Sequence, residues 1–226
     1  MSELFLVRHA QASFGTGDYD RLSGLGYRQA RWLGEHFRHL SLDFDAVVCG
    51  SMLRHRETTD EILAGLGRQG AEAGIDENWN EFDFEAVIRS YVSRFPAEQP
   101  GEAATTAQFT RLLRSALLAW SAGTLDGETP EAWPAFETRV RAALAAATRN
   151  HGRSVRVLVV SSGGAISMAL RQVLEAPAKA MVQMNLQLRN SSISHLYFND
   201  RGLHFSGFNH VPHLERPDRP GAITYY

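Results

Sequence analysis

An arginine and a histidine directly follow the first apolar run of the chain. Leu4 to Val7 is typical of a buried strand, and Arg8 and His9 come next. Arginine presents a planar fork of N–H donors that fits phosphate oxygens, and its charge favours the neutral form of a neighbouring imidazole. A neutral imidazole can act as a nucleophile. The pair therefore predicts a phosphate site with a histidine nucleophile, with a strand end capped by two solvated polar residues as the alternative.

A second arginine stands in a similar place. Residues 44–50 form another apolar run, Ser51 is typical of a helix N-cap, and Met52 to about Leu66 has helical spacing. Arg54 then falls in the first turn of that helix. Because the carboxyl ends of parallel strands share one edge of an open α/β sheet, we expect both arginines and the histidine at that edge. Such a set can form a phosphate pocket without a metal ion.

Three stretches, in register along the chain, resemble motifs of the histidine phosphatase superfamily in its phosphoglycerate mutase-like branch. Residues 6–10 resemble the L-x-R-H-G/A signature, and residues 22–30 resemble L-S/T-x-x-G-x-x-Q-A. Residues 51–58 resemble S-x-x-x-R-x-x-E-T, with one residue fewer before the arginine. The resemblance is weakest between about Phe82 and Arg153.

The resemblance implies one α/β domain over residues 1–226. The expected fold is a three-layer sandwich with a mostly parallel central sheet, helices on both faces and a helical lid insertion. We place that insertion at 82–153, where the spacing of apolar residues is helical. Packing helices of the core are the alternative for this stretch.

The resemblance also implies roles for single residues. His9 would be the nucleophile that becomes a phosphohistidine, and Arg8 and Arg54 would hold the phosphoryl oxygens. Glu81 falls where the family carries its general acid. A partly desolvated carboxyl group should have a raised pKa, which suits proton delivery to a leaving alkoxide. The alternative for Glu81 is a solvated loop carboxylate.

One position departs from the family pattern. The family writes S-H-G-G after the strand at 155–160, and its histidine contacts the transferring phosphoryl group, whereas this chain has Ser162 there. A neutral hydroxyl donor is roughly half as strong as a charged one, and losing one transition-state donor costs about 10²–10³ in rate. We still expect Ser162 to act as a catalytic residue, Ser162 and Gly163 to bind phosphate, and Ser162→His to restore a donor. Gly15 also departs, since many relatives place a phosphate-binding asparagine there.

Composition limits the classes of partner and compartment. The net charge of −2 gives no reason to expect nucleic acid or an anionic membrane as a partner. The single cysteine, Cys49, excludes an internal disulfide and is expected to be a buried, inert thiol. No apolar run reaches membrane-spanning length, and the N-terminus enters a strand without a signal peptide. These features predict a cytoplasmic protein whose oligomeric state is open, a homodimer being one option.

Neither a cofactor nor a metal ion is expected. His204, His210 and His213 are close in sequence, but no cysteine is near them and no fixed ligand spacing appears. Packed or surface histidines explain them more simply than a metal site does.

The favoured function is a metal-independent phosphomonoesterase, a histidine phosphatase that acts through a phosphohistidine on a small phosphorylated metabolite. The main alternative is a catalytically weak or inactive phospholigand-binding protein of the same fold, because Ser162 replaces the second histidine. A phosphoglycerate mutase is less favoured, since relatives with that activity continue past the acid as E-R-x-Y-G, whereas this chain has Glu-Phe-Asp-Phe at 81–84.

Overall fold

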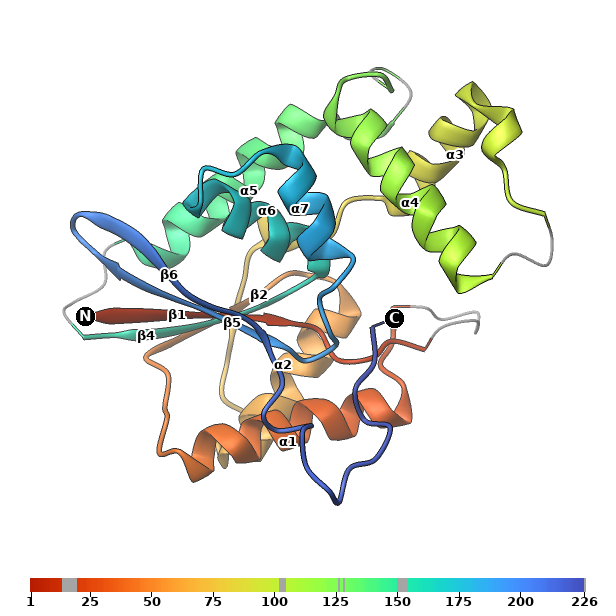
Figure 1. The fold of residues 1–226 in the computed structure, drawn as a ribbon. Coiled ribbons are helices and arrows are strands. Elements are labelled where there is room, and N and C mark those ends of the chain that lie inside the picture. The colour runs from red at the N-terminus through yellow and green to blue at the C-terminus, as the bar shows by residue number, and fades with distance from the viewer. Residues whose placement is uncertain (14–19, 102–104, 126, 128, 150–153, 226) are drawn as a thin grey trace.

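A six-stranded sheet forms the centre of the computed structural model, which describes residues 1–13, 20–101, 105–125, 127, 129–149 and 154–225 (Figure 1). Gly15 lies outside these residues. The strand order is β3-β2-β4-β1-β5-β6. β1, β2, β3 and β4 run parallel, whereas β5 is antiparallel to both of its neighbours. The strands are β1 (Ser2–Arg8), β2 (Ala46–Cys49), β3 (Gly74–Ile75), β4 (Arg156–Ser161), β5 (Ile193–Asn199) and β6 (Gly202–His210).

Helices cover both faces of this sheet, so the predicted α/β sandwich with a mostly parallel sheet is confirmed. Helices α1 (Gly24–His39) and α2 (Leu53–Leu66) pack together on one face. Helices α5 (Trp133–Thr148), α6 (Gly163–Val173) and α7 (Ala178–Asn185) lie on the other face (Figure 1). Helices α3 (Phe84–Arg94) and α4 (Thr106–Ser121) pack against each other, and the short helices η1 (Glu77–Trp79) and η2 (Pro96–Glu98) complete the described elements.

Alternation along β1 divides the core between the two faces. Successive side chains of a strand point to opposite sides. Phe5 and Val7 therefore join the core under α1 and α2, while Leu4 and Leu6 join the core under the opposite helices. All four are nearly or fully buried, which fixes the register of β1 and thus the place where Arg8 leaves the sheet.

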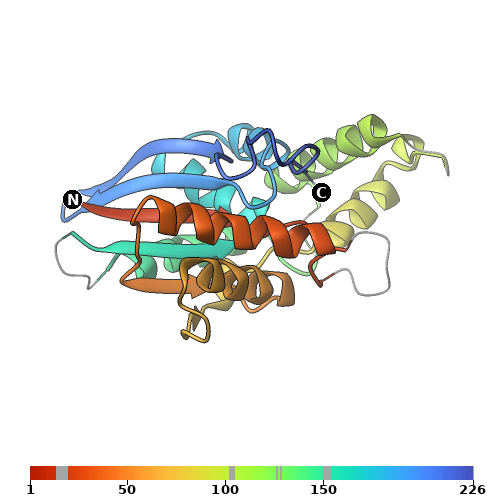
Figure 2. The ribbon, with the colours of Figure 1, turned by 90° about the horizontal axis from the view of Figure 1, so that it is seen from below.

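The helical stretch after Phe82 contributes to the core and also reaches past the sheet. Trp120 and Phe136 are fully buried, and the ring of Trp120 lies 4.9 Å from that of Phe82 and 5.5 Å from that of Phe136, between centroids. α5 packs on α6 as a core helix. Both ribbon views place α3 and α4 on the side of the sheet where β1 ends (Figures 1 and 2). A lid within 82–153 stays a prediction, and α3 and α4 are the part of it placed to act as one.

The C-terminal segment packs back onto the domain through a buried histidine. His213 is 1% exposed, and its Nε2 lies 2.7 Å from the Ser191 hydroxyl oxygen. Burial, with smaller contributions from the nearby charges of His36 and Arg219, lowers the pKa of His213 from its usual 6.5 to about 3. The ring is therefore neutral in the folded protein at neutral pH.

This histidine should make stability depend on pH. Below pH 6.5 His213 binds a proton in the unfolded chain but stays neutral in the folded protein. The contribution of His213 to stability is therefore complete above pH 6.5 and is lost as the pH falls towards 3. The slope is about 1.4 kcal/mol per pH unit for one proton. We expect His213→Gln to be less stable near neutral pH but to lose stability less steeply on acidification. Urea unfolding at several pH values measures this, and equal slopes for both proteins would contradict it.

Candidate active site

His9 leaves the sheet at the carboxyl end of β1, beside the end of β4. Arg8 pairs with Ser161 across the parallel strands, and the His9 amide donates to the Ser161 carbonyl at 2.8 Å. The His9 Nδ1 lies 2.8 Å from the Ala10 carbonyl oxygen. Because a carbonyl only accepts, Nδ1 carries the hydrogen and Nε2 keeps its lone pair. Nε2 is therefore the nitrogen able to attack an electrophile.

Burial keeps this imidazole neutral. The His9 side chain is 6% exposed, and desolvation lowers its pKa well below 6.5. The charges of Arg54 and Arg8 lower the pKa further, and the Ala10 carbonyl opposes them weakly. The direction of this pKa shift favours the neutral form of His9, as expected for an imidazole beside arginines.

Residues of the other two motifs hold the loop that follows His9. The Gln29 Oε1 accepts from the Gln11 amide at 2.8 Å, and the Thr58 Oγ1 accepts from the Ala10 amide at 3.1 Å. A Cβ on Gly26 would lie 2.1 Å from the Gln11 carbonyl oxygen, so only glycine lets α1 approach this loop. These motif residues act as scaffold.

Arg54 points into the same site from the first turn of α2. Its side chain is buried, and its Nη1 donates to the Asp20 Oδ1 at 2.7 Å. The other oxygen of Asp20 accepts from the Leu53 amide at 2.8 Å. Asp20 therefore satisfies the start of α2 and fixes the guanidinium at once.

The predicted N-cap of this helix is wrong. Met52, not Ser51, is the capping residue, and its side chain makes no cap bond. The Ser51 hydroxyl instead accepts from the Asn80 side chain at 2.8 Å, since the helix starts one residue later than predicted. A carboxylate distant in sequence supplies the capping bond, which local patterns do not reveal.

Arg8 is held by the chain around it. Its Nη1 donates to the Leu188 carbonyl and, at 2.8 Å, to the Tyr225 carbonyl. A Cβ on Gly163 would lie 3.7 Å from the Arg8 Nε and 2.6 Å from the Asn185 Oδ1. The guanidinium thus lies against the N-terminus of α6, where Gly163 keeps the backbone uncovered.

Glu81 reaches the same N-terminus from the loop after η1. Its Oε2 accepts from the Gly164 amide at 3.0 Å, and its Oε1 accepts from the Phe82 amide at 3.2 Å. Desolvation raises the pKa of Glu81 from its usual 4.5, while these two bonds and the Arg54 and Arg8 charges oppose the rise. The Gly164 amide at the start of α6 is therefore occupied by this carboxylate.

Ser162 lies between the end of β4 and the start of α6, and its neighbours include a histidine that sequence reasoning missed. Its side chain is fully buried, and its Oγ lies 3.4 Å from the Arg54 Nη2 and 2.6 Å from the His55 Nε2. The His55 ring lies 5.8 Å from the His9 ring, between centroids. The structure thus brings the predicted residues together and adds His55. The sequence held a signal for it, because position 162 lacks the histidine of the family pattern while a histidine directly follows Arg54.

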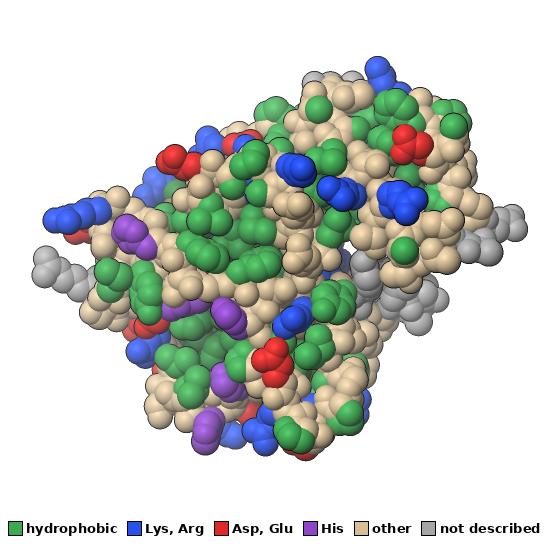
Figure 3. All heavy atoms as spheres, in the orientation of Figure 1, with side chains coloured by type: hydrophobic (Ala, Val, Ile, Leu, Met, Phe, Trp, Pro, Cys, Tyr) green, Lys and Arg blue, Asp and Glu red, His purple; other side chains and the backbone are tan. Residues whose placement is uncertain are grey.

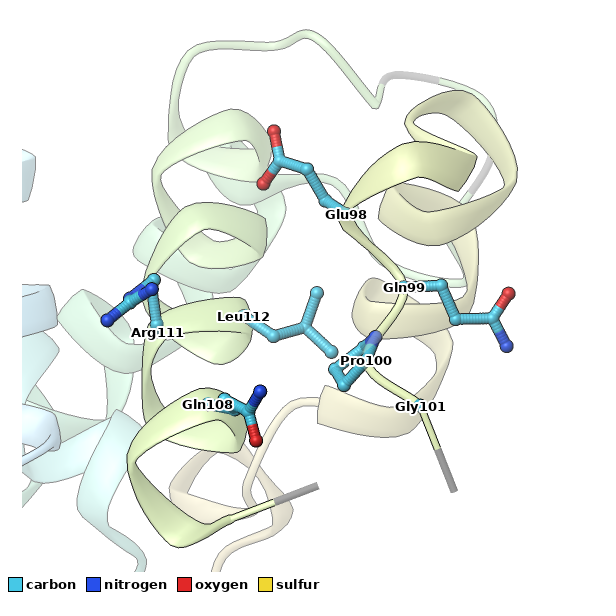
Figure 4. A pocket seen from close by; sticks show the side chains of 7 residues that line it. All are labelled: Glu98, Gln99, Pro100, Gly101, Gln108, Arg111 and Leu112. Atoms are coloured by element: carbon cyan, nitrogen blue, oxygen red, sulfur yellow. The ribbon is translucent and has the colours of Figure 1, made fainter. Parts of the chain in front are cut away.

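Other parts of the described chain offer less chemistry. A hollow beside α4 is lined by polar and apolar side chains without a histidine or cysteine, Arg111 being its cation (Figure 4). On the face in Figure 3, basic and acidic side chains are interspersed. Within the described ranges, no cluster of three His, Cys, Asp or Glu residues could hold a metal ion, and no helix could span a membrane. Cys49 is a buried free thiol.

Comparisons with known proteins agree with this geometry. The family model of the histidine phosphatase superfamily (branch 1) matches residues 4–211. Phosphoglycerate mutase from Bacillus anthracis has a similar structure, with a TM-score of 0.68, 17% identity and 94% coverage of each chain. A mutant phosphoserine phosphatase from Entamoeba histolytica, in complex with phosphoserine, has a TM-score of 0.65 and 18% identity. The match covers 95% of this chain and 100% of that one. The putative alpha-ribazole-5′-P phosphatase from Escherichia coli has a TM-score of 0.65 and 18% identity. The match covers 93% of this chain and 98% of that one. No curated protein matches.

The contact between Glu81 and α6 predicts the effect of adding one methyl group. A Cβ on Gly164 would lie 2.1 Å from the Glu81 Oε1 and 2.4 Å from the Phe82 ring, so Gly164→Ala should displace the carboxyl group. With Glu81 as the general acid that the sequence predicts, we expect turnover of an alkyl phosphate to fall about 10²-fold or more, the range for a lost acid catalyst. Gly24→Ala is the control, because a Cβ there meets nothing within 4 Å. Steady-state kinetics with thermal melts measure both, and a folded Gly164→Ala with full activity would contradict the role of this contact.

Proposed function

Because the chain belongs to branch 1 of the histidine phosphatase superfamily, we propose that it is a metal-independent phosphomonoesterase that acts on a small phosphorylated metabolite. The observation that supports this proposal most directly is the His9 imidazole, which is neutral, has its Nε2 lone pair available and lies beside the buried Arg54 guanidinium. Two arginines supply the positive charge that a phosphoryl dianion needs. The similar structures include phosphatases whose names specify small phosphoesters, which supports this substrate class.

The first chemical step transfers the phosphoryl group to His9. The Nε2 lone pair attacks phosphorus, so that a P–N bond forms while the P–O ester bond breaks. Arg8 and Arg54 stabilise the negative charge on the phosphoryl oxygens. Glu81, whose pKa burial raises, delivers its proton to the leaving oxygen and becomes a carboxylate.

The second step releases phosphate. Glu81 accepts a proton from a water molecule whose oxygen attacks phosphorus, and the P–N bond breaks. His9 regains its lone pair and Glu81 regains its proton, which completes the cycle. One carboxyl group serves both steps because its raised pKa favours the protonated form that the first step needs, and the carboxylate left by that step is the base that the second step needs.

The alternative is a phospholigand-binding protein on the same scaffold, which Ser162 favours because the hydroxyl is a weaker donor than an imidazolium. Turnover of a phosphomonoester separates these two functions. A mutase is less favoured, since Phe82 packs into the aromatic core beside Trp120 where mutase-like relatives carry a cation.

The intermediate can be trapped. We expect a radiolabelled phosphoester to label the wild-type protein with an acid-labile, base-stable phosphate, and to leave His9→Ala unlabelled, because no other nitrogen replaces Nε2. His39→Ala, at an exposed histidine, is the control and should label normally. Acid-quenched gels measure the label. Equal labelling of His9→Ala would remove the phosphohistidine mechanism.

The leaving group tests Glu81. Glu81→Gln should slow alkyl phosphates by about 10²–10⁴, because alkoxides need a proton to depart, and should slow nitrophenyl phosphate far less. For alkyl substrates the wild-type rate should fall as pH rises through the raised pKa of Glu81, and this dependence should vanish in the variant. Glu85→Gln, at an exposed carboxylate, is the control. Equal slowing of both substrate classes would show that Glu81 is not the acid.

A further inference from the structure

The turn between β4 and α6 lacks the histidine of the family pattern, but another element places an imidazole beside this turn. Ser162 stands where the family pattern has histidine, and the His55 Nε2 lies 2.6 Å from its hydroxyl oxygen. Both side chains are 0% exposed. His55 comes from α2, across the site from β4, so two elements together present a hydroxyl and an imidazole at one position.

The backbone makes room for this ring. A Cβ on Gly50 would lie 2.2 Å from the His55 Nδ1 and 2.9 Å from its Cε1, so glycine at the end of β2 is required for the ring to lie there. His55 and Arg54 are consecutive in α2, about 100° apart around the helix. Both nevertheless approach the Ser162 Oγ, the guanidinium at 3.4 Å.

Packing alone accounts poorly for a histidine at this place. Among the described residues its Nδ1 is buried without a hydrogen-bond partner. Desolvation and the Arg54 charge lower the pKa of His55 well below 6.5, so the ring is neutral. A buried polar group without a hydrogen-bond partner lowers stability, and an apolar side chain would avoid that cost. The ring therefore has a use in its contact with Ser162.

We propose that His55 and Ser162 together replace the second histidine of the phosphoryl site. The His55 Nε2–H donates to the Ser162 oxygen, and the Ser162 O–H donates to a phosphoryl oxygen. A hydroxyl has one hydrogen to give, so it can serve the substrate only if the imidazole donates to it. Ser162 would touch the substrate, while His55 is a positioning residue that orients and polarises the hydroxyl. The inference rests on the proposed phosphatase function.

This arrangement revises what Ser162→His should do. The sequence alone predicts a gain, because an imidazole would return to its family position. The structure removes the space for it, since the His55 ring already lies 2.6 Å from the Ser162 oxygen. A second ring fits only when the first is removed, so His55→Ala combined with Ser162→His should carry the imidazole back to the β4 turn.

The test is a set of variants of the full chain, assayed for kcat/KM on nitrophenyl phosphate with thermal melts. His55→Ala and Ser162→Ala should each lower kcat/KM by a factor of about 10²–10³, the effect of losing one transition-state donor. In the double alanine variant kcat/KM should fall no further than in the less active single variant. Each single substitution already breaks the same chain of hydrogen bonds, so the second has nothing more to remove. His55→Ala/Ser162→His should recover at least about tenfold over His55→Ala, and Ser162→His alone should gain nothing.

Two further variants separate function from folding. His55→Gln keeps an N–H donor and should retain more activity than His55→Ala, which also covers the case in which alanine fails to fold. His195→Gln is the control, because this packed histidine bonds Glu3 on the sheet away from the site. Wild-type activity in His55→Ala, additive losses in the pair, or no recovery on relocation would each overturn the inference while leaving the phosphatase standing. A wild type that neither turns over phosphoesters nor labels at His9 would overturn both.

Discussion

The parallel pairing of β1 with β4 is the constraint on which the site depends. Arg8 lies opposite Ser161, so the next residue of each strand, His9 and Ser162, leaves the sheet at the same edge. The bond from the His9 amide to the Ser161 carbonyl extends this register by one residue. Since the alternating burial of β1 fixes its register, a slip would turn every side chain to the other face. The core therefore aligns His9, the proposed nucleophile, with Ser162 at the end of the neighbouring strand.

Desolvation then prepares the two halves of the chemistry in opposite directions. It lowers the pKa of His9 and raises that of Glu81, so the same burial favours a neutral imidazole and a protonated carboxyl group. The arginines favour the neutral histidine but oppose the protonated carboxyl group. The Gly164 amide also opposes it, yet fixes where the carboxyl group lies. Burial at one positively charged edge thus shifts the two pKa values in opposite directions, which isolated residues in water would not show.

The sequence predicted the layers, the strand ends and most of the residues at the edge, because these follow from local patterns. Arg8, His9 and Arg54 each come just after a buried strand, and parallel strands end at one edge. It did not predict the Asp20 bond to Arg54 or the capping of α2, since a contact between residues 20 and 54 leaves no periodic signal. The sequence did not predict the contact of His55 with Ser162 for a related reason. His55 is one residue from Arg54 in the helix, and only the position of α2 decides which residues its side chain approaches.

The His55–Ser162 pair shows how one hydrogen-bonding role can be divided between two elements. A single histidine on a strand turn needs only that turn to be well placed. A hydroxyl from β4 and a ring from α2 need the sheet and the helix to meet within a few tenths of an ångström, since a bond of 2.6 Å tolerates little displacement. The Asp20 carboxylate supplies that accuracy at α2 by holding both the Leu53 amide and Arg54. Gly50 supplies it at β2 by leaving room for the ring. The positions that make this divided site workable are therefore scaffold residues, and the strength of the pair depends on how rigidly α2 is held against the end of β4.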